Sequence, residues 1–152
     1  MIYESGKDKQ KRPAADADEP DKYTSYIEYA LNERYFDVYI ELLLDDNRIR
    51  EALGAVSQKP NCPDDIVLCV ADIARRNYPA EAALLYRRLA EIYIGRKRRE
   101  RYREACEILR KMRSTMRADG DGDAWDRYLD SLMDLHHRRW ALREELRSAG
   151  LI

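Results

Sequence analysis

The sequence has few of the residues that interrupt or cross-link a chain. Its 152 residues include only six glycines, five prolines, three cysteines and one phenylalanine. So few helix breakers, together with 38% charged and 45% hydrophobic residues, predict an all-α fold with a highly charged surface. A chain of this length is expected to form one domain with a buried core.

Cysteine is too scarce and too irregularly spaced to cross-link the chain or to hold zinc. Cys62, Cys69 and Cys106 are an odd number and form no Cys-x-x-Cys pair. Cys69 and Cys106 fall on the apolar faces of predicted helices, where a free cysteine packs as a small hydrophobic residue. The sequence therefore predicts no disulfide framework, no metal site and no cofactor.

Long hydrophobic runs are absent as well. No apolar run approaches the roughly 20 residues that a membrane-spanning helix requires. The N-terminal residues are polar and charged, and they lack the hydrophobic region of a signal peptide. We therefore expect a cytoplasmic protein that does not associate with membranes.

Composition divides the chain into a short tail and a helical domain. Residues 1–21 are rich in Lys, Asp, Glu, Gln and Ala, which is typical of a disordered charged tail. From residue 22 onward, apolar residues recur at helical spacing, so residues 22–152 are predicted to form a single α-helical-repeat domain. The predicted helices cover residues 23–31, 35–44, 49–56, 63–74, 79–93 and 102–116, followed by a long seventh helix that ends near residue 148.

A Glu–Ala pair recurs in three of the predicted helices. The alanines of these pairs are 30 and 23 residues apart: Glu51–Ala52, Glu81–Ala82 and Glu104–Ala105. An alanine lets two helices approach closely, and the large apolar residues around it fill the contact. Short connections favour antiparallel neighbours. We therefore predict an all-α fold of about seven helices in stacked antiparallel hairpins, which is a degenerate α-solenoid.

Two known families share parts of this pattern. The hairpin that contains Ala82 and Tyr86 resembles a tetratricopeptide-type (TPR) unit, although its first helix lacks the Trp-Leu-Gly-Tyr signature of that family. Residues from about 65 to 146 more specifically resemble the helical C-terminal region that follows the zinc finger in bacterial and archaeal SWIM zinc-finger proteins. The matching segments are residues 83–90 (ALLYRRLA), residues 102–105 (YREA) with Leu109, then Trp125, Tyr128, Leu129, Leu132, residues 136–139 (HHRR) and Leu142.

This resemblance covers a little over half of the chain and implies a helical-repeat fold. The Cys-x-Cys and Cys-x-His ligands of the SWIM finger are absent from the sequence. The metal-binding and nucleic-acid roles of the finger are therefore not implied for this chain.

The leading candidate site is a stripe of arginines on the sixth predicted helix. At 100° per residue, five arginines fall within about an 80° sector beside the apolar face: Arg99, Arg103, Arg110, Arg113 and Arg117. Arginine presents a planar fork of donors that suits carboxylates and phosphates. The stripe therefore predicts a surface for an acidic partner. The alternative is a solvated flank that pairs with Glu107, or with Glu144 or Glu145 of a neighbouring helix.

The charge distribution gives the main alternative function. The net charge is −1, yet residues 75–117 hold 14 Lys and Arg against five acids. A concentration of basic residues favours association with nucleic acid through phosphate contacts, which would weaken steeply with salt.

Three weaker candidates have more ordinary interpretations. The loop Asp119–Asp123 imitates the start of a calcium loop, but Ala124 stands where the sharp turn needs glycine. We interpret the loop as a hinge whose Asp123 caps the last helix. His136 is expected to be a partly buried structural histidine on the same helix face as Trp125 and Trp140. The tyrosines of the first two helices are expected in the core, with an interface as the alternative: Tyr23, Tyr26, Tyr29, Tyr35 and Tyr39.

These patterns predict a binding module and no enzyme. The sequence contains no glycine-rich phosphate loop, no serine-nucleophile motif and no Cys–His arrangement for catalysis. We expect a protein-interaction or scaffold module that binds an acidic or amphipathic segment, with nucleic acid as the alternative partner. Solenoid ends expose apolar faces unless they are capped, so the first or the last helix could also pair with a second copy of the chain.

Overall fold

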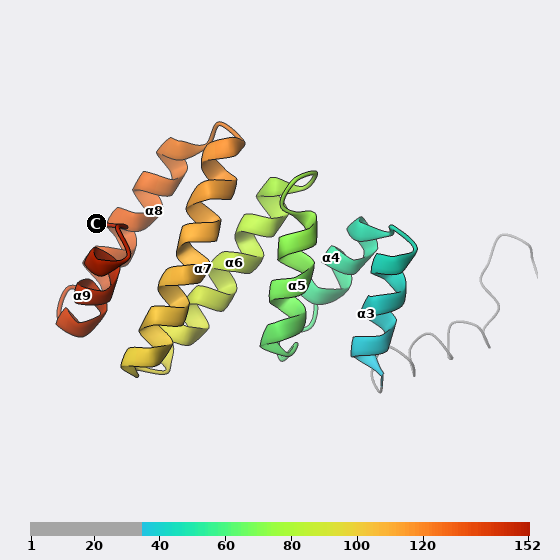
Figure 1. The fold of residues 1–152 in the computed structure, drawn as a ribbon, viewed down its shortest axis with the longest axis horizontal. Coiled ribbons are helices and arrows are strands. Elements are labelled where there is room, and N and C mark those ends of the chain that lie inside the picture. The colour runs from blue at the N-terminus through green and yellow to red at the C-terminus, as the bar shows by residue number, and fades with distance from the viewer. Residues whose placement is uncertain (1–34) are drawn as a thin grey trace, which may run out of the picture. The chain divides into compact units, whose positions relative to one another are not determined.

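The structure is a computed structural model that describes residues 35–152, and every regular element among these residues is an α-helix (Figure 1). The chain divides into two units, Met1–Leu42 and Leu43–Ile152, and the boundary falls within α3. The seven helices of the described residues are α3 (Phe36–Asp45), α4 (Ile49–Ser57), α5 (Asp64–Ala74), α6 (Pro79–Gly95), α7 (Arg99–Ala118), α8 (Gly122–Leu135) and α9 (Trp140–Ser148).

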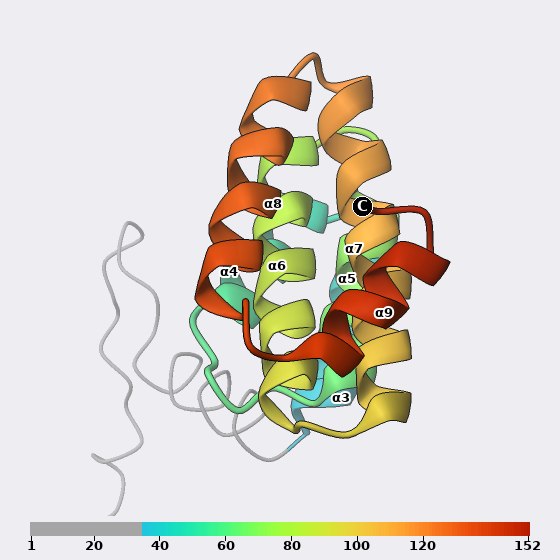
Figure 2. The same ribbon diagram turned by 90° about the vertical axis from the view of Figure 1, so that its left-hand side faces the viewer.

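The helices of the second unit lie in two layers. Figure 2 shows α5, α7 and α9 in one layer and α4, α6 and α8 in the other. Consecutive helices from α4 to α8 contact each other, most extensively α6 with α7, and α9 contacts α7. The largest of the fully buried side chains in this unit are those of Trp125, Tyr86, Leu89, Ile94, Leu109, Leu142 and Leu146.

The three alanines of the Glu–Ala pairs lie in the helix contacts. Ala52 on α4, Ala82 on α6 and Ala105 on α7 have no exposed surface. A side chain of one carbon allows the partner helix to lie close, so these positions set the distance between neighbouring helices. The prediction that they lie in helix contacts is confirmed.

Left-handed residues follow four of the helices in residues 35–152, and at three of these ends the hydrogen bonding is alike; the fourth is Lys97, after α6. Asn47, Gly120 and Gly150 have φ values of 59°, 79° and 76°. After each of them, the next residue donates its backbone N–H to a carbonyl five residues back, over 2.8 to 2.9 Å. This is the Schellman arrangement, which satisfies carbonyls at a helix end and reverses the chain toward its next neighbour.

The long seventh helix of the prediction is wrong, because the chain breaks between α8 and α9. His136 adopts φ −112° and ψ 30°, and Arg139 precedes the first turn of α9. No glycine or proline marks this break. The turn brings Leu142 and Leu146 of α9 into the core against α7, which one straight helix would not do. The gain in buried apolar surface overrides the local helical preference.

Other predicted helices agree in position to within a few residues. The helix predicted at 23–31, the tail at 1–21, and Tyr23, Tyr26 and Tyr29 lie outside the described residues. Three predicted apolar-face positions are wrong, since Tyr35, Cys69 and Trp140 are exposed. Trp140 is exposed because the chain break moves it out of the face of Trp125 and into the first turn of α9.

Candidate partner-binding surface

All five arginines of the predicted stripe lie on α7, but they do not share one environment. Arg99 donates to Glu145 over 2.7 Å and to Glu144 over 3.1 Å. Arg103 donates to the other oxygen of Glu145 over 3.3 Å. The Arg99 guanidinium also lies 5.7 Å from the centre of the Trp140 ring. These two arginines hold α9 against α7, as the alternative interpretation of the stripe predicted.

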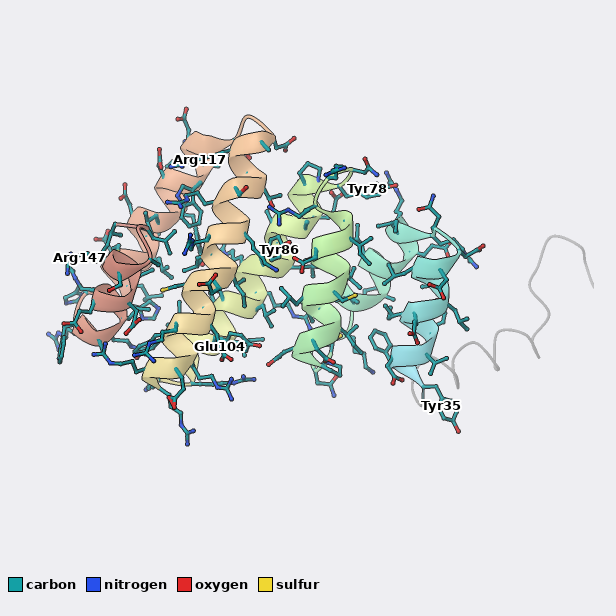
Figure 3. All side chains as sticks on the ribbon, viewed as in Figure 1. Tyr35, Tyr78, Tyr86, Glu104, Arg117 and Arg147 are labelled. Carbon is teal, nitrogen blue, oxygen red and sulfur yellow. The ribbon has the colours of Figure 1, made fainter. Side chains whose placement is uncertain are left out.

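The other three arginines lie toward the end of α7 and make fewer hydrogen bonds and ion pairs with the rest of the protein. Arg113 donates to the backbone carbonyl of Gly150 over 3.0 Å, at the end of α9. Arg110 lies 3.9 Å from Glu107, one turn away, and both side chains are at least half exposed. The side chain of Arg117, near the α7–α8 turn (Figure 3), is exposed and makes no hydrogen bond or ion pair with any residue in 35–152. Arg110 and Arg117 are therefore the stripe members that can still accept an external anion.

Arginines outside the stripe cap helix ends within the α4, α6 and α8 layer. Arg88 on α6 donates to the carbonyls of Val56 and Lys59 over 2.9 and 2.5 Å, where α4 ends. Arg139 donates in the same way to the carbonyl of Ile94 near the end of α6, over 3.1 Å. The last carbonyls of a helix lack intrahelical partners, so a cation there satisfies them and the helix dipole together. The sequence reasoning missed this use of arginine, because its distant carbonyl partners leave no local pattern.

A polar cleft of about 630 Å³ lies beside the stripe, between the ends of α5 and α7 and the start of α6. Its wall carries a charged group at Asp72. The Asp72 carboxylate accepts the hydroxyl of Tyr86 over 2.5 Å and the ammonium of Lys111 over 2.9 Å. Burial and this carboxylate raise the pKa of Tyr86, so the phenol remains a donor. The lining residues are Asp72, Ile73, Arg75, Arg76, Asn77, Pro79, Ser114, Thr115, Ala118 and Asp119.

The cleft offers both a free cation and an exposed apolar side chain. Arg76 is exposed and has no hydrogen-bond or ion-pair partner within residues 35–152. Ile73 is 46% exposed. On α7, Arg110 and Arg117 flank Ser114 within about 60° of the helix circumference, next to the cleft lining. Arg76 lines this recess, and Arg110 and Arg117 lie on α7 outside its lining; these three arginines are here called the cationic rim.

Much of the basic excess of residues 75–117 is used inside the protein. Seven of these cations make ion pairs with carboxylates: Arg87, Arg96, Arg99, Arg101, Arg103, Arg110 and Lys111. Arg88 and Arg113 donate to backbone carbonyls. Pairing of this kind lowers the positive potential that phosphates would meet, so the sequence count overstates the basic surface.

The weaker candidates have structural roles at helix ends. Asp121 precedes the first turn of α8 and Asp123 lies within that turn, so the predicted cap at Asp123 is wrong by two positions. No cluster of His, Cys, Asp and Glu in residues 35–152 has the arrangement of a metal site. His136 is half-buried. Desolvation is the main cause that lowers its pKa, and the positive charge of Arg139 lowers it further. His137 contacts the carbonyl of Asp134 at 3.0 Å.

Two of the three cysteines are buried thiols. Cys62 and Cys106 are buried, whereas Cys69 is exposed on α5. Desolvation is the main cause that raises the pKa of both buried thiols, to about 12 for Cys106. These two side chains behave as small apolar groups in the core.

Across residues 35–152, no helix combines the length and the apolar character needed to cross a bilayer.

Comparison with known proteins gives one partial match. No protein-family model matches the chain, and no solved structure matches it significantly. The chain is similar to the protein described as "Uncharacterized protein YwqB" of Bacillus subtilis (strain 168), with 34% identity over 67 residues. The matched segment is 44% of this chain, and it spans only 12% of the length of YwqB.

Proposed function

We propose that this chain is a non-catalytic, cytoplasmic protein-interaction module with a degenerate, TPR-like α-solenoid fold. Its partner is an acidic, amphipathic segment of another protein. The observation that carries the proposal is the cationic rim: Arg76 lines the cleft, Arg110 and Arg117 lie one turn before and one turn after its lining residue Ser114, and all three side chains are exposed. The resemblance to SWIM C-terminal regions stays a prediction.

The two-layer packing supports the solenoid part of the proposal. Each layer is joined by side-chain contacts between helices two apart in the chain. Lys111 joins α7 to α5, and Arg99 joins α7 to α9. In the other layer, Tyr128 on α8 donates to Glu91 on α6 over 2.8 Å. Contacts that repeat between every second helix are typical of helical-repeat stacks, whose layers present extended surfaces to partners.

The chemistry of the cleft favours an acidic amphipathic ligand over a purely polar one. Ile73 offers apolar surface at the wall, while the cationic rim offers forks for carboxylates. Asp72 is already neutralised by Lys111, so it repels an incoming carboxylate less than a free aspartate would. A segment with one apolar residue flanked by Asp or Glu satisfies both parts of the recess.

The contribution of the stripe is expected to be uneven. Arg110 and Arg117 would contact the partner, whereas Arg99, Arg103 and Arg113 already hold α9 and the residues that follow it. Reversing the charge of Arg99 would therefore weaken the fold instead of one binding contact.

The test is a selection of random peptides displayed on phage against the immobilised full chain. We expect the recovered peptides to be enriched in Asp and Glu around one large apolar residue. The same selection is run against the variant Arg76→Glu/Arg110→Glu/Arg117→Glu. A control variant carries an equal charge change away from the cleft, at Arg98→Glu/Arg127→Glu/Arg147→Glu.

The acidic peptides should be recovered on the wild type and on the control variant, and lost on the cationic-rim variant. Circular dichroism confirms that each variant folds. Recovery of acidic peptides on all three proteins would show that the cationic rim is not the site. A single-stranded oligonucleotide that binds wild type at low salt, is displaced at high salt and is lost in the cationic-rim variant would replace the peptide proposal with nucleic-acid binding.

A further inference from the structure

The second surface of interest lies on the opposite layer, in the groove between α6 and α8. Two adjoining hollows of about 320 and about 250 Å³ run along this groove, and Arg87 and Tyr128 belong to both. Figure 2 shows α6 and α8 side by side over their lengths. Because α6 and α8 run in the same direction, the hollows occupy the two ends of one continuous groove.

Each end of the groove carries one highly exposed leucine. Leu84 on α6 is 64% exposed at the end near the α7–α8 turn, and Leu135 on α8 is 75% exposed at the other end. The hollow beside Leu84 is walled by Ala83, Met112 and Met116, and is lined largely by apolar surface. Large apolar side chains at such exposure mark a surface that another molecule covers.

The two ends of the groove also carry opposite charge. Near Leu84, most of the exposed charged residues are acidic, namely Glu81, Asp121 and Asp123, and the exposed cation of that hollow, Arg87, pairs with Glu91. Near Leu135, the chain turns place Lys97 and Arg138, both exposed, beside Arg139, and these cations outnumber the exposed Asp134. The side chains of Lys97 and Arg138 make no hydrogen bond or ion pair within residues 35–152, and neither do those of Glu81 and Asp121.

We propose that the α6–α8 groove pairs with the same groove of a second copy of this chain, in an antiparallel, two-fold arrangement. Two-fold pairing places the acidic end of one copy on the basic end of the other, and it does so twice. It also directs Leu135 of each copy into the hollow beside Leu84 of its partner. One end of the groove is acidic and hollow, and the other is basic and carries a protruding leucine. Such a surface is complementary to itself under a two-fold rotation.

This proposal is independent of the cleft and its acidic ligand, because neither exposed leucine and none of the charged residues exchanged below lines the cleft. Sedimentation velocity of the full chain over a series of concentrations tests whether two copies associate. The mass of the wild type should rise toward twice the 18.0 kDa of one chain. Leu84→Glu/Leu135→Glu should remain at 18.0 kDa, whereas Ile73→Glu, which alters an exposed apolar residue of the other layer, should associate as the wild type does.

Charge exchange identifies the occupant as a second copy. Glu81→Lys/Asp121→Lys makes both ends basic, and Lys97→Glu/Arg138→Glu makes both ends acidic. Each variant alone should have a dissociation constant at least tenfold higher than the wild type. An equimolar mixture of the two should recover association, because each reversed end meets the complementary reversed end of the other variant.

Several results would overturn this assignment. One is a wild type that stays at 18.0 kDa up to about 100 μM. Association that is unchanged by Leu84→Glu/Leu135→Glu would place the dimer contact elsewhere. Failure of the mixed charge variants to associate would reject the antiparallel arrangement. Circular dichroism confirms the fold of every variant before its mass is measured.

Discussion

Arg99 on α7 donates to Glu145 on α9 over 2.7 Å, and Glu145 is only 12% exposed. The same carboxylate also accepts a hydrogen bond from Arg103, so one largely buried acid holds two arginines of the predicted stripe. We predict that Glu145→Gln lowers the melting temperature more than Glu107→Gln does. Glu107 is 73% exposed and its only ion pair within residues 35–152 is a 3.9 Å contact with Arg110, so water screens it. Thermal unfolding of both variants checks this difference, and equal melting temperatures would contradict it.

The close helix contacts should not tolerate larger side chains. Ala105 on α7 has no exposed surface, so Ala105→Leu must displace the packed neighbours. Overpacking of this kind costs about 1–3 kcal/mol of the free energy of unfolding. Ala118→Leu changes an exposed position of the same helix and should shift that free energy by less than about 0.5 kcal/mol. Urea unfolding gives both values, and an unchanged Ala105→Leu protein would show that the alanine contacts do not set the helix spacing.

The three-residue contact at Asp72 joins α5, α6 and α7. Tyr86 is fully buried and its hydroxyl donates to Asp72, which Lys111 also contacts. Tyr86→Phe removes one hydrogen bond to a charged acceptor, and it should lower the free energy of unfolding by about 1–2 kcal/mol. If the phenol and the ammonium support each other through Asp72, Lys111→Met should lower the free energy of unfolding by less in the Tyr86→Phe protein than in the wild type. Additive losses in this double-mutant cycle would mean that the two contacts act separately.

The stability of the fold should fall in mild acid because of His136. Desolvation and Arg139 lower the pKa of His136 below its ordinary value of 6.5, against a smaller opposite effect of Glu91. A group whose pKa is lower in the folded state stabilises the fold above its unfolded pKa. That contribution is lost as the pH falls through the folded pKa. The free energy of unfolding should therefore drop between about pH 7 and about pH 5, and the drop should be smaller in His136→Gln. An identical drop in both proteins would assign the pH dependence to other groups.

Helical periodicity predicts the class and position of most elements, because the apolar faces of α4 to α7 recur at regular spacing. The buried alanines could also be predicted, since small residues repeat beside large apolar ones. The break between α8 and α9 could not be predicted, because His136 and Arg139 carry no local signal for a chain reversal. That break depends on Leu142 and Leu146 reaching the core beside α7, which is a long-range contact.

The candidate site shows the same division between local and long-range information. The sequence predicts that five arginines share a face of α7, and it offers Glu144 and Glu145 as alternative partners. It does not predict which arginines are used inside the fold, because that depends on where α9 lies. It also misses Arg76, which lies in the turn after α5 and comes near α7 only through the packing of α5 on α7.

The most direct test of the central claim is the affinity of one selected acidic peptide for three proteins, measured by fluorescence anisotropy at fixed salt. The proteins are the wild type, Arg76→Glu/Arg110→Glu/Arg117→Glu and the charge-matched Arg98→Glu/Arg127→Glu/Arg147→Glu. The account predicts that the cationic-rim variant raises the dissociation constant at least tenfold, which corresponds to about 1.4 kcal/mol, while the control changes it by less than about threefold. Equal affinities for all three proteins, or equal losses in both variants, would contradict a binding site at the cationic rim.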